Sequence, residues 1–318
     1  MSTSTSVANA VTGEPHTLEL GAGLRPGEMV ALGFFIYGLV ASLAFALGAR
    51  ERWLAVGLLV LTGAVVISMS RIARPSRLTA AVRDWFPAVL ILVAYRVSGL
   101  FLIPDSTRRL DLLFVQWDRA LLQNPSVTAL LSTTAPWLQR YLELAYLMCY
   151  PLVPLGLAAL SVAAVYDRRR GSAGYDPNKA ALIERRYREA IDRFWTTVLL
   201  AVLTCYAIYP FFPLTPPRVL FHDVPGPVVE PLLRRVNFWI LNQYSVQACI
   251  FPSGHVAAVT ATALAVRAYL PRVGLLFLVA AASVALATVY GRYHYSADAV
   301  AGAAVAAAAF LVARRIQR

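Results

Sequence analysis

Charged residues are scarce in this chain of 318 residues. Only 14% are Asp, Glu, Lys or Arg, whereas about a quarter of an ordinary soluble domain is charged. Hydrophobic residues make up 58%, and the mean hydropathy is +0.61. This composition excludes a soluble globular enzyme, a disordered protein and a fibrous protein. It predicts a chain whose main solvent is lipid.

Two residue types are nearly absent, and each absence excludes a class of protein. The three cysteines, Cys149, Cys205 and Cys249, show neither a CxxC spacing nor the Cys/His spacing of a zinc site, so we expect no disulfide framework and no structural zinc. Lysine occurs once, at Lys179, and arginine supplies almost all the cations behind the net charge of +12. Because no basic stripe is interleaved with aromatic residues, we expect no nucleic-acid partner.

Long apolar runs dominate what is present. Eight of them are long enough to cross a bilayer as helices, which takes about 20 residues each. We expect these spans near residues 29–49, 53–70, 85–103, 141–166, 194–213, 255–271, 273–290 and 295–313. The alternating pattern of a membrane β-barrel is missing. The expected fold class is therefore all-α, a polytopic helical membrane protein.

The distribution of Lys and Arg predicts how the chain is oriented. Loops on the side of the two termini hold more basic residues than loops on the opposite side. Because basic residues gather in cytoplasmic loops, we expect both termini in the cytoplasm and the protein in the cytoplasmic membrane. Residues 1–27 lack a basic region followed by a cleavable apolar core, so we expect a flexible tail there and not a signal peptide.

Two loops on the extracytoplasmic side are unusual in composition. Residues 104–140 contain Trp117 and Trp137, and residues 214–250 contain five prolines and an amphipathic stretch from Val228 to Leu241. Both are typical of segments that lie in the membrane interface. They would serve either as plain anchors or as a lid or wall over a site on that face.

Two of the four histidines lie in motifs on this same face. The sequence Phe-Pro-Ser-Gly-His occupies residues 251–255, just before the sixth span, and Gly-Arg-Tyr-His-Tyr-Ser-Ala-Asp occupies residues 291–298, between the last two spans. A third fragment, Pro-Pro-Arg at residues 216–218, follows the fifth span. Since three segments far apart in the sequence reach one face, we expect them to form one site.

The motif histidines and Asp298 suit a covalent phosphoryl transfer. His294 and Asp298 are four residues apart, which places them on one face of a helix. A carboxylate bonded to one ring nitrogen fixes the tautomer and leaves the other nitrogen free to attack. His255 would then protonate the leaving oxygen.

Other residues of the motifs suit phosphate binding. The helix that follows Ser253 and Gly254 offers N–H groups and a partial positive charge at its N-terminus, and glycine permits a close approach of the backbone. Arg218 and Arg292 offer planar guanidinium groups that clamp phosphate oxygens.

Three other interpretations of these residues compete with phosphoryl transfer. The two histidines would be ordinary polar caps, or His255, His294 and Asp298 would hold a metal ion. We expect neither a metal nor a cofactor, because phosphate chemistry uses all three side chains without one. A protease pair of Ser253 and His255 is excluded, since residues two apart do not face each other on a helix.

The Pro-Ser-Gly-His sequence at residues 252–255, followed by His294-x-x-x-Asp298, resembles the type 2 phosphatidic acid phosphatase superfamily. The resemblance implies a six-helix catalytic core, here residues 85–318, with His255 as general acid and His294 as the nucleophile held by Asp298. Residues 28–84 would add two accessory transmembrane helices.

The chain departs from the family pattern in two places. Pro-Pro-Arg218 stands where the family pairs a lysine with a downstream Arg-Pro. Thr288 stands six residues before the nucleophile, where an arginine is usual, and Arg292 lies two residues before it. Both changes, and residues 143–151, look like the branch that contains inositol phosphorylceramide synthases and related headgroup transferases.

The resemblance implies phosphoryl transfer on membrane lipids at the extracytoplasmic face. An inositolphosphotransferase-like headgroup transferase fits the branch, and a lipid phosphate or prenyl diphosphate phosphatase is the alternative, because water and an alcohol need the same general base. A catalytically silent lipid binder or transporter is the alternative of another class.

Two charged residues fall inside expected spans, Arg96 in the third and Glu143 in the fourth. An intramembrane charge needs a partner or a water-filled cavity. At about 1.5 Å of rise per residue their depths are close enough for long side chains to meet. We expect an ion pair between them, or a supporting layer under the phosphate. The small residues from Ala299 to Ala309 predict a close helix-packing face.

Overall fold

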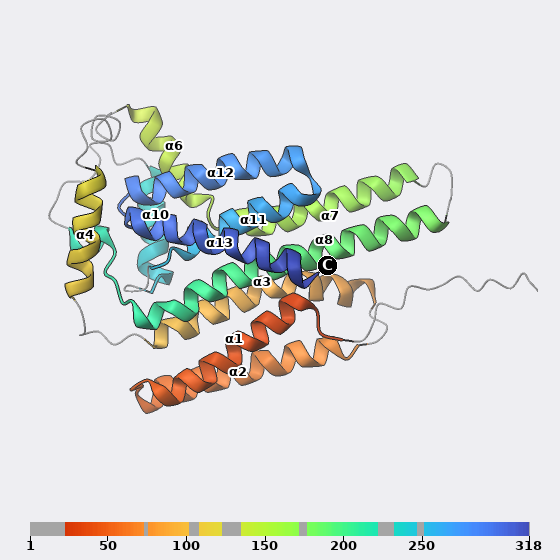
Figure 1. The fold of residues 1–318 in the computed structure, drawn as a ribbon, viewed down its shortest axis with the longest axis horizontal. Helices are drawn as coiled ribbons and strands as arrows, with labels where there is room; N and C mark the ends of the chain where they lie inside the picture. The colour runs from red at the N-terminus through yellow and green to blue at the C-terminus, as the bar shows by residue number, and fades with distance from the viewer. Residues whose placement is uncertain are drawn as a thin grey trace, which may run out of the picture.

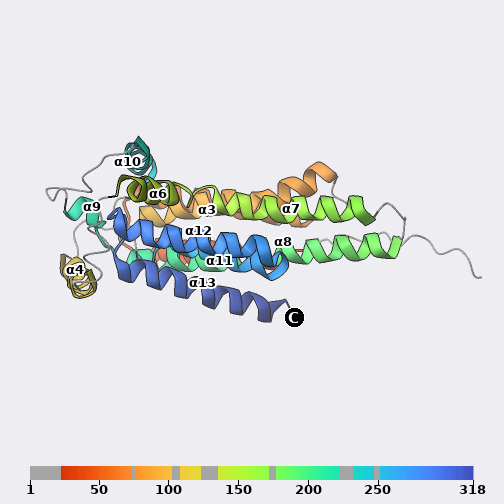
Figure 2. The same ribbon diagram turned by 90° about the horizontal axis from the view of Figure 1, so that it is seen from above.

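The computed structural model describes residues 23–72, 76–101, 108–122, 135–171, 177–221, 232–246 and 251–317. Every regular element within these ranges is a helix (Figures 1 and 2). The all-α fold class is confirmed for this part of the chain. The expected tail at residues 1–27 lies mostly outside the described residues.

Long helices run along the length of the molecule, and short ones gather at one end of it (Figure 1). The long helices are α1 (Pro26–Ala44), α2 (Ala49–Ser70), α3 (Arg77–Leu100), α7 (Leu152–Gly171), α8 (Pro177–Ile208), α11 (Gly254–Tyr269), α12 (Pro271–Tyr290) and α13 (Ser296–Ile316). The short ones are α4 (Arg108–Leu122), α6 (Pro136–Leu147), α9 (Pro217–Leu220), α10 (Leu232–Tyr244) and the 3₁₀ turn η1 (Tyr209–Phe211).

Each of the eight expected spans falls on one of the long helices, with one important difference. Among the described residues, six helices are long and apolar enough to cross a membrane, and α11 is shorter at 16 residues. The expected span at residues 141–166 is wrong as one continuous helix, because α6 and α7 meet at a bend of 71°. Pro151 immediately precedes α7, and a proline has no N–H with which to continue the preceding helix.

Helix α8 forms the centre of the bundle. It packs against α1, α3, α7, α11 and α13, and 67% of its apolar window is buried, against 44% or less in the other five candidate spans. The helices packed on α8, and α2 and α12 packed on those helices, expose large apolar side chains, among them Leu61, Leu92, Val162 and Leu276. Outward-facing leucine and valine are what a bundle solvated by lipid requires.

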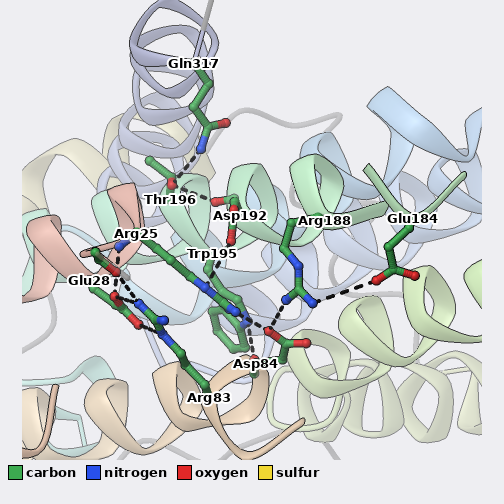
Figure 3. A network of polar contacts seen from close by, with 11 residues as sticks. Arg25, Glu28, Arg83, Asp84, Glu184, Arg188, Asp192, Trp195, Thr196 and Gln317 are labelled. Carbon is green, nitrogen blue, oxygen red and sulfur yellow. Dashed lines mark hydrogen bonds and ion pairs between the residues drawn. The ribbon is translucent and has the colours of Figure 1, made fainter. Parts of the chain in front are cut away.

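The first two helices pack onto this centre through α1 and α3. Figure 3 shows a polar cluster that joins the start of α1 and the start of α3 to α8. Arg83 pairs with Glu28, and Asp84 pairs with both Arg25 and Arg188. The boundary expected between residues 84 and 85 falls within α3.

The chain path brings the three motif segments to one end of the bundle. Helix α8 ends there and leads into α9, α11 starts there, and α12 returns there before α13 departs (Figures 1 and 2). The two loops expected at the membrane interface hold α4, α6, α9 and α10 at this same end. This end is called the site end below.

Candidate active site

The two motif histidines face each other directly. His255 lies in the first turn of α11, and His294 lies in the loop between α12 and α13. Nδ1 of His255 and Nε2 of His294 are 3.3 Å apart. On its other side, Nδ1 of His294 lies 3.4 Å from Oδ2 of Asp298. A proton on Nδ1 of His294 therefore faces a carboxylate, and its Nε2 faces His255.

Asp298 is held so that it can orient His294. Its side chain is fully buried, and Oδ2 accepts the backbone N–H of Tyr295 at 3.0 Å, which caps the start of α13. Oδ1 has no hydrogen-bond partner within the part of the chain that the structure describes. A buried carboxylate with unused capacity stabilises a positive imidazole strongly. It would therefore support the charge that His294 develops on attack.

The loop that carries His294 is fixed by its own backbone. The N–H groups of Tyr293 and His294 both donate to the carbonyl of Thr288, at 2.9 and 3.0 Å. Arg292 adopts a φ of +60°, a conformation uncommon for residues with a side chain, and its carbonyl accepts the N–H of Arg218 at 2.9 Å. Thr288, which stands where the family usually has an arginine, is fully buried and holds this loop through its carbonyl oxygen.

Arg218 supplies a cation for which the described residues provide no matching anion. Its Nη2 lies 3.4 Å from Oγ of Ser245, and no carboxylate pairs with it among the described residues. Burial lowers the pKa of its guanidinium from the ordinary value, yet an arginine stays protonated in proteins. A partly buried positive charge of this kind is suited to a phosphate.

These groups line one cavity with about 350 Å³ of empty space, which includes space open to solvent. His255, His294 and Arg218 lie in its wall, together with tyrosines from four segments of the chain. The tyrosines are Tyr95, Tyr146, Tyr209 and Tyr293. Cationic, imidazole and hydroxyl groups around one space suit a phosphoryl group.

Ser253 and Gly254 build the turn before α11 and are not among the described residues that line this cavity. Oγ of Ser253 accepts the N–H of Val256 at 3.3 Å, and the backbone N–H of Ser253 donates to the carbonyl of Asp298 at 3.1 Å. The N–H of Gly254 donates to the hydroxyl of Tyr209 at 3.2 Å, and a Cβ at this position would lie 2.7 Å from that hydroxyl. Their role as phosphate ligands stays a prediction.

The side chain of Arg292 is also outside the described lining of the cavity. Burial, and then the nearby positive charge of Arg234, lower the pKa of Arg292. Its role in phosphate binding likewise stays a prediction, and of the two predicted arginines only Arg218 lies in the cavity wall.

The predicted pair of Arg96 and Glu143 is wrong. Arg96 is exposed on α3, whereas Glu143 is buried in α6 and pairs with Arg234 of α10 at 2.6 Å. Asn237 also donates to Glu143 at 2.9 Å. The depth estimate failed because α6 is not the end of a straight span. It bends away from α7, and α10 covers it.

Glu143 nevertheless reaches the cavity through Tyr293. The hydroxyl of Tyr293 donates to Oε2 of Glu143 at 2.6 Å, and the Tyr293 ring stacks on Tyr146 with centroids 3.7 Å apart. Sequence reasoning missed Tyr293, Arg234 and Asn237. The spacing of Arg234, Asn237 and Leu241 marks one face of α10, but the sequence alone does not say that this face contacts α6.

No group of three His, Cys, Asp or Glu side chains is placed to hold a metal ion within the described ranges. His16 and His222, the two histidines outside the motifs, lie outside those ranges.

Comparison with known proteins gives one family match, which covers part of the chain. Residues 179–312 match a family model described as the PAP2 superfamily. No curated protein and no solved structure matches the chain. The matched segment runs from α8 to α13 and includes Arg218, His255, His294 and Asp298. It supports a relationship of this chain to the type 2 phosphatidic acid phosphatase superfamily.

Proposed function

We propose that this chain is an integral membrane enzyme that transfers phosphoryl groups of lipids through a phosphohistidine at His294. One observation carries the proposal: a histidine backed by a buried carboxylate, a second histidine in contact with it and an arginine without a carboxylate partner among the described residues surround one cavity. The match to the PAP2 superfamily independently supports a lipid phosphoryl-transfer or phosphatase function.

The first chemical step forms the phosphohistidine. Arg218 holds the non-bridging oxygens of the phosphate, and Nε2 of His294 attacks phosphorus. The bond from phosphorus to the leaving oxygen breaks, its electron pair stays on that oxygen, and protonated His255 gives the oxygen a proton. Asp298 stabilises the positive imidazole that results. A bound phosphoryl group would replace the direct contact between the two rings.

The second step regenerates His294. An acceptor hydroxyl loses its proton to His255 and attacks phosphorus, and the electron pair of the P–N bond returns to Nε2. Water as acceptor makes the enzyme a lipid phosphate or prenyl diphosphate phosphatase, and an alcohol makes it a headgroup transferase. The positions of Arg218 and Arg292 differ from the usual motifs of the superfamily and look like those of the inositol phosphorylceramide synthase branch. This likeness favours transfer of the inositolphosphotransferase type. Four tyrosines in the cavity wall, which offer both aromatic faces and hydroxyls, also suit a polyol acceptor.

The membrane supplies the substrate in this proposal. The site lies at one end of the bundle, among short helices that reach beyond the long ones (Figure 2), where lipid headgroups would be found. The greater number of Lys and Arg on the side of the termini favours an extracytoplasmic site end. A lipid binder or transporter without catalysis is the other class, and the intact His294–Asp298 pair argues against it.

The test follows a phosphate label. Purified wild type and the His294→Ala variant are incubated in mixed micelles with chelator, labelled phosphatidic acid, phosphatidylinositol or a prenyl diphosphate, and inositol and diacylglycerol as acceptors. We expect turnover to fall by a factor of at least about 10³ in the variant, while His16→Ala, a histidine change outside the motifs, keeps wild-type turnover. Label in free phosphate indicates hydrolysis, and label in a new ester indicates transfer. Turnover that survives in His294→Ala would refute the mechanism.

A further inference from the structure

Helix α4 carries two carboxylates that bond to two different catalytic segments. Oδ1 of Asp111 accepts the backbone N–H of Thr215 at 2.8 Å, just before the Pro-Pro-Arg fragment at residues 216–218. Oδ1 of Asp118 accepts the backbone N–H of Ser296 at 2.8 Å and the hydroxyl of the same serine. Ser296 begins α13, two residues after His294.

Between these carboxylates, Phe114 contacts the third segment. The centroid of its ring lies 5.0 Å from that of Phe251, which opens the 251–255 motif, and 5.7 Å from that of Tyr295. The hydroxyl of Tyr295 donates to the carbonyl of Thr215 at 3.1 Å, so two of the three segments are also joined to each other. Residues 111, 114 and 118 share one face of a helix by their spacing. One face of α4 therefore touches all three motif segments.

The opposite face of α4 is exposed and carries large apolar side chains. Leu112, Leu113 and Trp117 are exposed there, beside the polar Gln116 and Arg119. In Figures 1 and 2, α4 runs across the bundle axis at the site end. A helix lying across the ends of membrane spans with an outward tryptophan and leucines is suited to the boundary between lipid headgroups and acyl chains.

We propose that α4 is a membrane-seated clamp: the lipid interface holds its outer face, and Asp111 and Asp118 fix the catalytic segments relative to that face. Asp111 and Asp118 are positioning residues, and they do not touch the reacting atoms. The inference rests on the proposed function for its kinetic consequence, because only a phosphoryl-transfer enzyme needs Arg218, His255 and His294 in register. Its structural consequence, that seating α4 in lipid orders the segments, is independent of the reaction.

The structural test uses hydrogen exchange of the full chain in phospholipid nanodiscs. We expect Asp118→Ala to speed exchange in the peptide that contains Ser296, and Asp111→Ala in the peptide that contains Thr215, at least tenfold in each case. We expect the double change Leu113→Glu with Trp117→Glu to speed exchange in both peptides without altering either aspartate. Gln116→Glu adds one negative charge at an exposed position of α4 that is already polar, and it should leave both peptides unchanged. Unchanged exchange in the double variant would overturn the clamp.

A second measurement checks the lipid contact. Phospholipids brominated near the start of the acyl chain should quench the part of the fluorescence that is lost in Trp117→Phe. If that part is not quenched, the outer face of α4 is not in the interface and the proposal is wrong.

The kinetic test separates positioning from general stability. Asp118→Ala should lower kcat at least tenfold with KM within about twofold of wild type, and Asp118→Asn should restore most of the loss, because an amide oxygen still accepts both bonds from Ser296. Arg119→Ala, an exposed neighbour, is the control. Equal kcat in Asp118→Ala and wild type, with His294→Ala inactive, would refute the clamp alone. Activity in His294→Ala would refute the proposed mechanism, and the exchange test of the clamp would still stand.

Discussion

At the scale of a single residue, the ionisation of Asp118 should make the stability of the protein depend on pH. It lies on α4, outside the long helices, and burial raises the pKa of its carboxyl above the ordinary value, although the bonds from Ser296 lower it in part. A raised pKa means that the folded protein binds the proton more tightly than the unfolded chain. The stability of the wild type should therefore fall as the pH rises from about 4 through the raised pKa, and this loss should be complete above it.

The variant Asp118→Asn should lack this dependence, because its amide is neutral at every pH and still accepts from Ser296. We expect it to be more stable than wild type at neutral pH and to approach wild type near pH 4. Unfolding in mixed micelles, measured as a function of pH for both proteins, checks the difference. If wild type is instead the more stable protein at neutral pH, and loses that advantage toward pH 4, the carboxylate is stabilised in its place and the prediction is wrong.

At the same scale, the sequence predicted the residues whose chemistry is local. His294 and Asp298 are four positions apart and lie close together as expected, but the shared helix face expected for them is wrong, because His294 lies in the loop just before α13. The partners of Glu143 could not be predicted in this way. They depend on α10 packing against α6, a contact between segments about 90 residues apart, which no spacing within either segment reveals.

At the scale of elements, Gly302 decides how closely α13 approaches the turn before α11. A Cβ at this position would lie 2.4 Å from the carbonyl oxygen of Ser253, a backbone atom that cannot turn aside. Ser253 also donates to the carbonyl of Asp298. Gly302→Ala should therefore destabilise the protein by about 1–3 kcal/mol and reduce turnover, because the turn that carries His255 shifts relative to Asp298.

Gly57→Ala is the matched control, since Gly57 also lies within a helix and a Cβ there meets nothing within 4 Å. Alanine favours a helix over glycine by about 1 kcal/mol, so this variant should be as stable as wild type or more so. Both comparisons use unfolding and turnover in the same micelles. Equal stability of the two variants would mean that α13 and α11 can separate at no cost.

At the same scale, the lengths of the apolar runs predicted where the long helices lie, but they did not predict whether each run forms one continuous helix. Each expected span coincides with a long helix, because a bilayer demands long apolar runs whatever the tertiary contacts are. The break between α6 and α7 was missed, and so was the continuity of the charged residues before position 194 with the apolar run at residues 194–213 in one helix, α8. Hydropathy does not show where a helix bends. It also does not show where charged residues that favour helix extend a membrane-spanning helix beyond the membrane.

For the whole molecule, the polar cluster of Figure 3 decides whether α1 and α2 are a separate addition or part of one body. Glu28 receives two bonds from Arg83, both at 2.7 Å, and the two side chains are each 8% exposed. The carbonyl of Asp84 accepts the indole N–H of Trp195 at 2.6 Å, which joins α3 to α8. Removal of one member of a buried ion pair leaves the other charge without compensation.

Arg83→Ala should therefore lower the free energy of unfolding of the whole chain by about 3–5 kcal/mol, in one cooperative transition that includes α8 and α13. Arg185→Ala removes a pair with Glu189 whose side chains are 73% and 55% exposed, and it should cost no more than about 1 kcal/mol. Because the cluster lies at the starts of α1 and α3, away from the site end (Figure 1), turnover per folded molecule should stay at the wild-type level in both variants. Unfolding by sodium dodecyl sulfate in mixed micelles, followed by circular dichroism and by activity, makes the comparison. Two separate transitions in Arg83→Ala, with activity lost only in the second, would instead make the first two helices an independent unit.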